Sequence, residues 1–167
     1  MAGPARSIDF VPLSDVLPRE LRAVELGLRR PAIELERHSA AGNRIGWHWY
    51  PEHSEPPPPS SRAYQLLVDA TITLLDGDHD WLELSLDIAW CPALTVNAAV
   101  EVACWCPQDH GMHQVREACW PAATGAGLVD GFTAGAAMLI EVLDSGRFDP
   151  RPWRREAGLP DAPAAPL

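Results

Sequence analysis

Apolar and polar residues alternate along several stretches of the chain, and this alternation predicts β-strands. It is clearest in residues 64–74, 82–90 and 96–106, and residues 113–120 can supply a fourth strand. A period of two is typical of antiparallel strands with one buried face. Because only short turns separate these stretches, we predict a curved antiparallel β-meander of about four to six strands.

Two other stretches have helical spacing. Leu17, Leu21, Val24 and Leu28 recur three or four positions apart, and Pro31 is expected to end that N-terminal helix. Residues 124–145 form the second predicted helix, with an apolar stripe made by Leu128, Phe132, Ala136, Leu139, Ile140 and Leu143.

The C-terminal helix contains three glycines at intervals of four, Gly127, Gly131 and Gly135. Glycine inside a helix costs about 0.5–1 kcal/mol relative to alanine. We therefore expect this ridge to allow close packing, either onto the sheet or onto a partner helix.

The remaining segments complete an α+β protein with an N-terminal and a C-terminal helix packed on the sheet. Residues 32–50 read as a β-hairpin, and the proline-rich residues 51–61 as an extended spacer. Residues 1–13 are expected to be an extended lead-in, residues 14–146 a single domain, and residues 147–167 a partly mobile tail rich in proline and arginine.

The composition narrows the possible functions. The chain has 167 residues and a formal net charge of −10, so its surface repels nucleic-acid phosphates and anionic lipids. It contains no apolar run of eighteen residues and no continuous apolar signal segment. We therefore expect a cytoplasmic protein that binds neither nucleic acid nor membranes.

All thirteen basic residues are arginine, and the absence of lysine excludes several activities. Lysine-bound pyridoxal chemistry, Walker-type phosphate loops and protein-kinase chemistry all need a lysine. The GxSxG and HExxH motifs are also absent. Together with abundant alanine, proline and glycine, the arginine bias indicates a bacterium with a high-GC genome.

Cysteine and histidine gather near the end of the third strand and in the fourth, and they are the candidate chemistry of this chain. Cys104 and Cys106 share a face of one strand and lie about 6.6 Å apart. Two thiolates on one zinc ion need sulfurs about 3.8 Å apart, so this pair alone does not chelate zinc. The simplest interpretation is that the cysteines are small core residues.

Two other interpretations of this segment follow from a hairpin register that pairs Cys106 with His113 and Val102 with Glu117. One is a small-molecule pocket on the inner sheet face lined by Glu117, His113 and Cys106, with Glu117 or His113 as general base and Cys106 as nucleophile. The other is a zinc site made by Cys106, His110 and His113.

The same register has a consequence for the outer face, where it places Glu101 beside Arg116 as a cross-strand ion pair. No cofactor is predicted apart from that candidate zinc ion.

Aromatic residues form a second candidate site. Trp47, Trp49 and Tyr50 lie just before Pro51, and Trp47 and Trp49 share a face of a predicted strand. Such a cluster is either core or a ligand or protein interface.

The sequence favours a non-catalytic binding or interaction module that acts on a protein partner or on its own copies. A homodimer through residues 32–50 or through the glycine ridge is the expected assembly. The alternatives are a small-molecule-binding protein or enzyme built on the inner-face pocket, and a zinc-binding protein. The sequence leaves the question of enzymatic activity open, with the balance against it.

Overall fold

The computed structural model describes residues 12–17, 19–39, 45–58, 60, 64–75, 80–106, 109–145 and 150–159. Five antiparallel strands form one sheet in the order β1-β2-β3-β4-β5, which confirms the predicted α+β meander. The strands are β1 Trp47–Trp49, β2 Gln65–Leu75, β3 Asp80–Trp90, β4 Leu94–Cys106 and β5 Asp109–Pro121.

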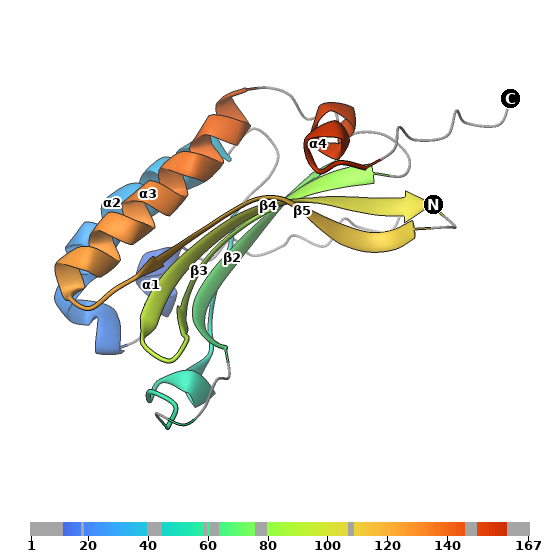
Figure 1. Ribbon diagram of the computed structural model, residues 1–167. Coiled ribbons are helices and arrows are strands. Elements are labelled where there is room, and N and C mark those ends of the chain that lie inside the picture. Colours follow the sequence, from blue (N-terminus) through green and yellow to red (C-terminus); the bar gives the residue numbers. More distant parts are fainter. Residues whose placement is uncertain are drawn as a thin grey trace, which may run out of the picture.

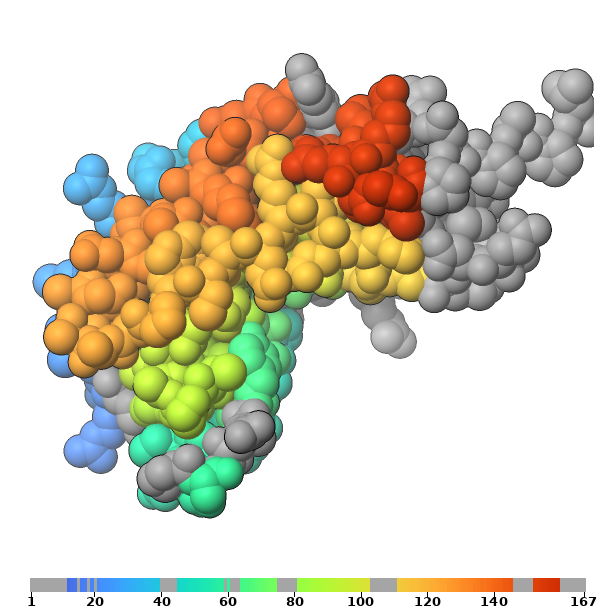
Figure 2. Space-filling model, viewed as in Figure 1, coloured from blue at the N-terminus to red at the C-terminus, as the bar shows by residue number. Residues whose placement is uncertain are grey.

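The α-helices come before and after the strands in the chain, and a short 3₁₀ helix lies between β1 and β2. The α-helices are α1 Leu13–Val16, α2 Glu25–His38, α3 Gly125–Asp144 and α4 Pro150–Glu156, with 3₁₀ helices η1 Arg19–Val24 and η2 Pro51–His53. Figure 1 shows α2, α3 and α4 on the same side of the sheet. The sheet bends so that its concave side faces away from these helices, and the outline in Figure 2 is indented there.

Residues 32–38 were expected to be a strand and are instead the second half of α2. Leu28, Ala32 and Leu35 are buried at helical spacing, and α2 packs along α3. This tertiary packing outweighs the loss of one backbone hydrogen bond at Pro31. Pro31 therefore does not end the helix, and only the second half of the predicted hairpin, at β1, is a strand.

Two shorter segments also differ in detail from the expectation. Residues 51–53 of the predicted extended spacer form η2, and Pro57 is buried. Within the expected tail, α4 places Trp153 in the core with 6% of its surface exposed. The predicted lead-in up to residue 11 and the end of the tail from residue 160 lie outside the described residues.

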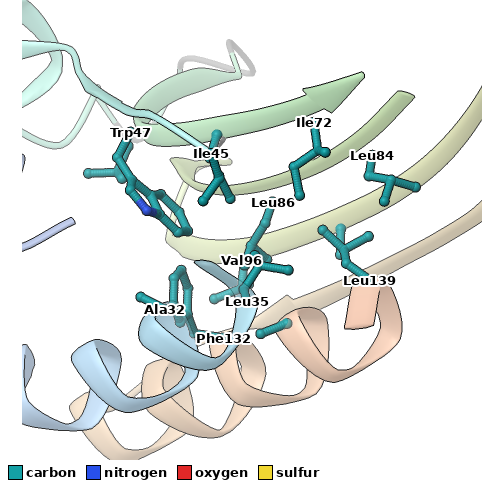
Figure 3. Close-up of a cluster of buried hydrophobic side chains, with 14 of the residues drawn as sticks. Ala32, Leu35, Ile45, Trp47, Ile72, Leu84, Leu86, Val96, Phe132 and Leu139 are labelled. Atoms are coloured by element: carbon teal, nitrogen blue, oxygen red, sulfur yellow. The ribbon is translucent and has the colours of Figure 1, made fainter. Parts of the chain in front are cut away.

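The core lies between the helices and the inner, helix-facing side of the sheet. Trp47 packs against Phe132 with ring centroids 5.6 Å apart, and the Trp47 Nε1 donates a 3.0 Å hydrogen bond to Glu36 Oε1. Figure 3 shows how these rings meet the aliphatic side chains of the sheet. On β2, β3 and β4 the inner-face residues are buried almost completely: Val68, Ala70, Ile72, Leu74, Leu82, Leu84, Leu86, Ile88, Val96, Ala98, Val100 and Val102.

The glycine ridge of α3 packs onto the sheet. A Cβ at Gly131 would lie 2.8 Å from Trp120 Cβ, and one at Gly135 would lie 2.7 Å from Leu86 Cδ1. Thr124 caps the start of the helix by accepting a 3.0 Å hydrogen bond from the Gly127 amide. Of the two expected uses of the ridge, the structure therefore shows packing against the sheet.

By length and composition alone, α3 is apolar enough to cross a membrane. Its buried residues Leu128, Phe132, Ala136 and Leu139 pack in the core between the helices and the sheet. The helix therefore packs as part of the core.

Candidate functional site

The concave side of the sheet has no helix packed on it among the described elements, and we call it the open face. Most of its described side chains are half-buried or exposed, in contrast to the buried inner face, although Ala89 and Thr95 at one end of it are buried. The strand registers place the following residues on the open face: His48, Asp69, Thr71, Thr73, Trp81, Glu83, Ser85, Asp87, Asn97, Ala99, Glu101, Met112, Gln114, Glu117 and Cys119.

One row of polar residues crosses all five strands of this face. Asp69 is paired with His48 on one side and with Asp87 on the other. Asp87 is in turn opposite Asn97, and Asn97 is opposite Cys119. Directly opposed side chains have Cβ atoms about 4.5–5.5 Å apart, so the two aspartates are near neighbours.

Asp87 is the most strongly hydrogen-bonded carboxylate of this row. Its Oδ1 accepts a 2.5 Å hydrogen bond from the Tyr64 hydroxyl and a 2.8 Å bond from Asn97 Nδ2. Burial raises the pKa of Asp87 and the Asp69 charge adds to the rise, while the two hydrogen bonds oppose it. Burial and the hydrogen bond to Asp87 likewise raise the pKa of Tyr64.

The carboxylate of Asp69 has fewer hydrogen bonds than that of Asp87. The hydroxyl of Tyr50 interacts with the Asp69 carboxylate, and burial together with this carboxylate raises the pKa of Tyr50. The Oδ1 oxygen of Asp69, however, is buried and has no hydrogen-bond partner among the residues that the structure describes. A buried carboxylate oxygen without a donor destabilises the fold.

A second acidic pair lies further along the same face. Glu83 and Glu101 are directly opposite each other on β3 and β4. Burial, followed by the nearby charges of Glu83 and Glu117, raises the pKa of Glu101. The open face therefore carries two directly opposed like-charge pairs, with a fifth carboxylate from Glu117.

The pKa shifts of Tyr50, Tyr64 and Cys119 do not indicate activated nucleophiles. Activation of a thiol or hydroxyl lowers its pKa, whereas the shifts at Tyr50, Tyr64 and Cys119 are all upward. For Cys119, burial is the largest cause and the neighbouring thiol of Cys91 is the next. These groups therefore stay protonated at neutral pH and act as donors or contact surface.

The predicted grouping of Glu117 with His113 is wrong. A β-bulge at Val115 adds one residue to β5, so His113 is opposite Val102 on the inner face while Glu117 is opposite Ala99 on the open face. One extra residue moves every later side chain to the other face. Glu117 is exposed, and the two residues cannot line one pocket.

The bulge also separates the expected ion pair of Glu101 with Arg116. Arg116 is opposite Val100 and lies on the helix side, where its Nε donates a 3.0 Å hydrogen bond to Glu156 Oε1. Its guanidinium also lies 5.0 Å from the ring centroid of Trp153 in α4. Glu101 is instead opposite Gln114.

The zinc hypothesis rests on Cys106, His110 and His113. The side chains of Cys106 and His110 lie outside the part of the chain that the structure describes, although the backbone pairs Cys106 with Asp109. Among the described side chains no group of three or more histidine, cysteine or acidic residues is arranged to hold a metal ion.

The structure separates the three aromatic candidates. Trp47 is 1% exposed and belongs to the core, so it is not an interface residue. Trp49 is 41% exposed. Tyr50 stacks on His53 with ring centroids 6.1 Å apart and reaches Asp69 at the margin of the open face.

Sequence reasoning did not single out Asp69, Asp87 or Tyr64 as site residues. The sequence does indicate that both aspartates occupy polar positions in the alternating patterns of β2 and β3. Aspartates on the polar side of two adjacent strands lie on the same face of the hairpin. Residue spacing alone gives the face of each aspartate; the register is needed to show that they are opposite each other.

Comparisons of the chain with family models, with curated proteins and with solved structures give no match.

Proposed function

We propose that the protein is a non-catalytic binding module that docks a protein partner on the open face of its sheet. The observation that carries this proposal is that the described helices cover only one face of a bent sheet and none of them packs on the concave face (Figure 1). Tyr64 and Met112 are 49% and 44% exposed at opposite ends of this face, with polar residues between them. Aromatic residues and methionine are enriched in protein interfaces, so these two exposed side chains fit a docking surface.

Among its described side chains, the inner face offers no comparable space. Its residues from Val68 to Val102 are closely packed under α2 and α3, and Glu117 points away from it. The upward pKa shifts of the hydroxyls and the thiol on the open face also favour binding over catalysis.

Self-association is the second candidate function. It is favoured by β5, a strand of thirteen residues at the edge of the five-stranded sheet, because an edge strand can pair with a second copy. Two open faces would bring like charges together, so a dimer would use this edge. Sedimentation velocity at several protein concentrations measures the assembly state.

Position-specific photo-cross-linking in cells of the source organism tests the proposal. A photoreactive amino acid replaces Thr71, which is exposed at the centre of the open face, or Ala137, which is exposed on α3. We expect one reproducible cross-linked protein from position 71 and none from position 137. Cross-links only to further copies of this chain, or equal cross-linking from both positions, would contradict the proposal.

A further inference from the structure

The chemistry of the open face indicates what kind of partner it fits. Five carboxylates project from the face, at Asp69, Glu83, Asp87, Glu101 and Glu117. Among the described open-face residues there is no arginine, and the chain contains no lysine. The negative charges of this face are therefore not balanced by cations within the face.

The one described arginine of the sheet is bound elsewhere. Arg116 lies on the helix side, where it pairs with Glu156 and stacks over Trp153. The bulge at Val115 produces this arrangement, because without it Arg116 would reach the same face as Glu101. Arg116 therefore does not balance the negative charge of the open face.

The acidic pairs also have a regular spacing. The pair Asp69–Asp87 and the pair Glu83–Glu101 share strand β3, where Asp87 and Glu83 are four residues apart. Four residues of a strand span about 13–14 Å. An extended segment lying along β3 covers the same distance with side chains four positions apart.

The carboxylates of Asp69 and Asp87 also differ in their hydrogen bonding. The Oδ1 of Asp69 is buried and lacks a donor among the described residues, while Asp87 beside it already accepts two hydrogen bonds. A guanidinium group carries five N–H donors in a planar fork and can serve two neighbouring carboxylates at once. It would neutralise the opposed charges.

We infer that the partner docks a basic, arginine-bearing extended segment on the open face, with one arginine between Asp69 and Asp87 and another near Glu83 and Glu101. This inference rests on the proposed function and names the chemistry of its partner. Nucleic acids and anionic membranes are repelled by the same charges. The open face of a second copy of this chain is repelled for the same reason.

A defined peptide tests this chemistry on the full-length protein. The probe is a fluorescein-labelled, amidated nonapeptide of threonine with arginine at positions 1, 5 and 9, and its counterpart has glutamate at those positions. Fluorescence anisotropy at about 0.15 M salt measures the dissociation constants, because at this ionic strength charges separated by more than about 8 Å are largely screened.

Two double variants that lose the same amount of negative charge distinguish binding at a local site from general electrostatic attraction to the protein. Asp69→Asn combined with Asp87→Asn neutralises the pair on the open face. Asp130→Asn combined with Glu141→Gln removes two exposed carboxylates from α3. We expect the first variant to weaken binding of the arginine peptide at least tenfold and the second to change it less than twofold, with no binding of the glutamate peptide.

A further double variant, Glu83→Gln with Glu101→Gln, provides the same test if the aspartate variant does not fold by circular dichroism. Equal weakening by open-face and α3 variants, or no binding of the arginine peptide, would overturn the inference. If cross-linking from position 71 still identifies a partner in that case, the docking face stands and only the basic chemistry is wrong. Loss of both results would overturn the proposed function too.

Discussion

Asp69 and Asp87 are directly opposite each other on neighbouring strands, and the buried Oδ1 of Asp69 has no donor among the described residues. Like charges in this position destabilise a sheet. Glu83 and Glu101 repeat the arrangement on the next pair of strands. Local rules of this kind are commonly broken where a surface serves binding, at the expense of stability.

Glu101→Gln should stabilise the protein at pH 7. The substitution removes one member of the like-charge pair with Glu83, and opposed like charges contribute roughly 0.2–1 kcal/mol. Because Glu101 is only half-buried, solvent screening places the expected gain at the lower end of this range. Urea unfolding measures it, with Glu141→Gln on α3 as the charge-matched control. Equal gains from both variants would show a net-charge effect instead.

The gain from Glu101→Gln should depend on pH. Burial and the charges of Glu83 and Glu117 raise the pKa of Glu101 in the folded state. A carboxyl with a raised folded pKa contributes stability that is fully present below the unfolded pKa, near 4.3, and lost as the pH rises through the folded pKa. The advantage of the variant should therefore be largest at neutral pH and vanish below about pH 4. A gain that is constant with pH would contradict this origin.

Gly131→Ala should destabilise the protein although alanine favours helices. A Cβ at this position would lie 2.8 Å from Trp120 Cβ, and the resulting strain should cost about 1–3 kcal/mol, more than the propensity gain. Gly127→Ala is the matched control, because the atom nearest to its Cβ is Thr124 Oγ1 at 3.4 Å. Urea unfolding should show a loss only for Gly131→Ala, and a stabilised Gly131→Ala would show that α3 does not pack this closely.

Trp47→Phe should destabilise the protein, whereas Trp49→Phe should have little effect. The indole of Trp47 is buried against Phe132 and donates a hydrogen bond to Glu36, so its loss should cost about 1–3 kcal/mol. Trp49 is 41% exposed. Thermal and urea unfolding compare the two variants. Similar losses from both would place Trp49 in the core as well.

Removal of the Trp153 side chain should loosen α4. The side chain is 6% exposed in the core, and the Arg116 guanidinium lies over its ring. Trp153→Ala should therefore lower the free energy of unfolding by about 3 kcal/mol. Arg155→Ala, which alters an exposed residue of the same helix, is the control. Hydrogen exchange of the α4 amides should rise in the first variant alone, and unchanged exchange would mean that Trp153 does not hold the helix.

The fold class could be predicted from the sequence because alternation in β2, β3 and β4 and the helical stripe of α3 are strong periodic signals. The continuation of α2 beyond Pro31 could not, since it depends on packing against α3 that outweighs the local effect of proline. In the sequence it is indicated by the helical spacing of the apolar residues Leu28, Ala32 and Leu35.

The site was harder to predict than the fold for two physical reasons. Strand β5 begins at Asp109, so Cys106 is opposite Asp109 and not opposite His113 as predicted, and a bulge follows within β5. The bulge at Val115 has no marker in the sequence, yet it reverses the facing of Arg116, Glu117 and Cys119. His113, which precedes the bulge, does face inward as the predicted register required. The aspartate pair depended in the same way on the register of a different hairpin, β2–β3, which periodicity leaves undetermined.

The central claim is that the open face docks a protein partner, and blocking the face while cross-linking from it tests that claim most directly. A photoreactive residue in place of Thr73 reports docking, and Ser85→Arg places a bulky cation at the centre of the face. We predict that Ser85→Arg lowers the yield of the cross-linked partner at least tenfold, while Ala137→Arg on α3 leaves it unchanged. An equal yield from the two arginine variants would show that the partner does not bind this face.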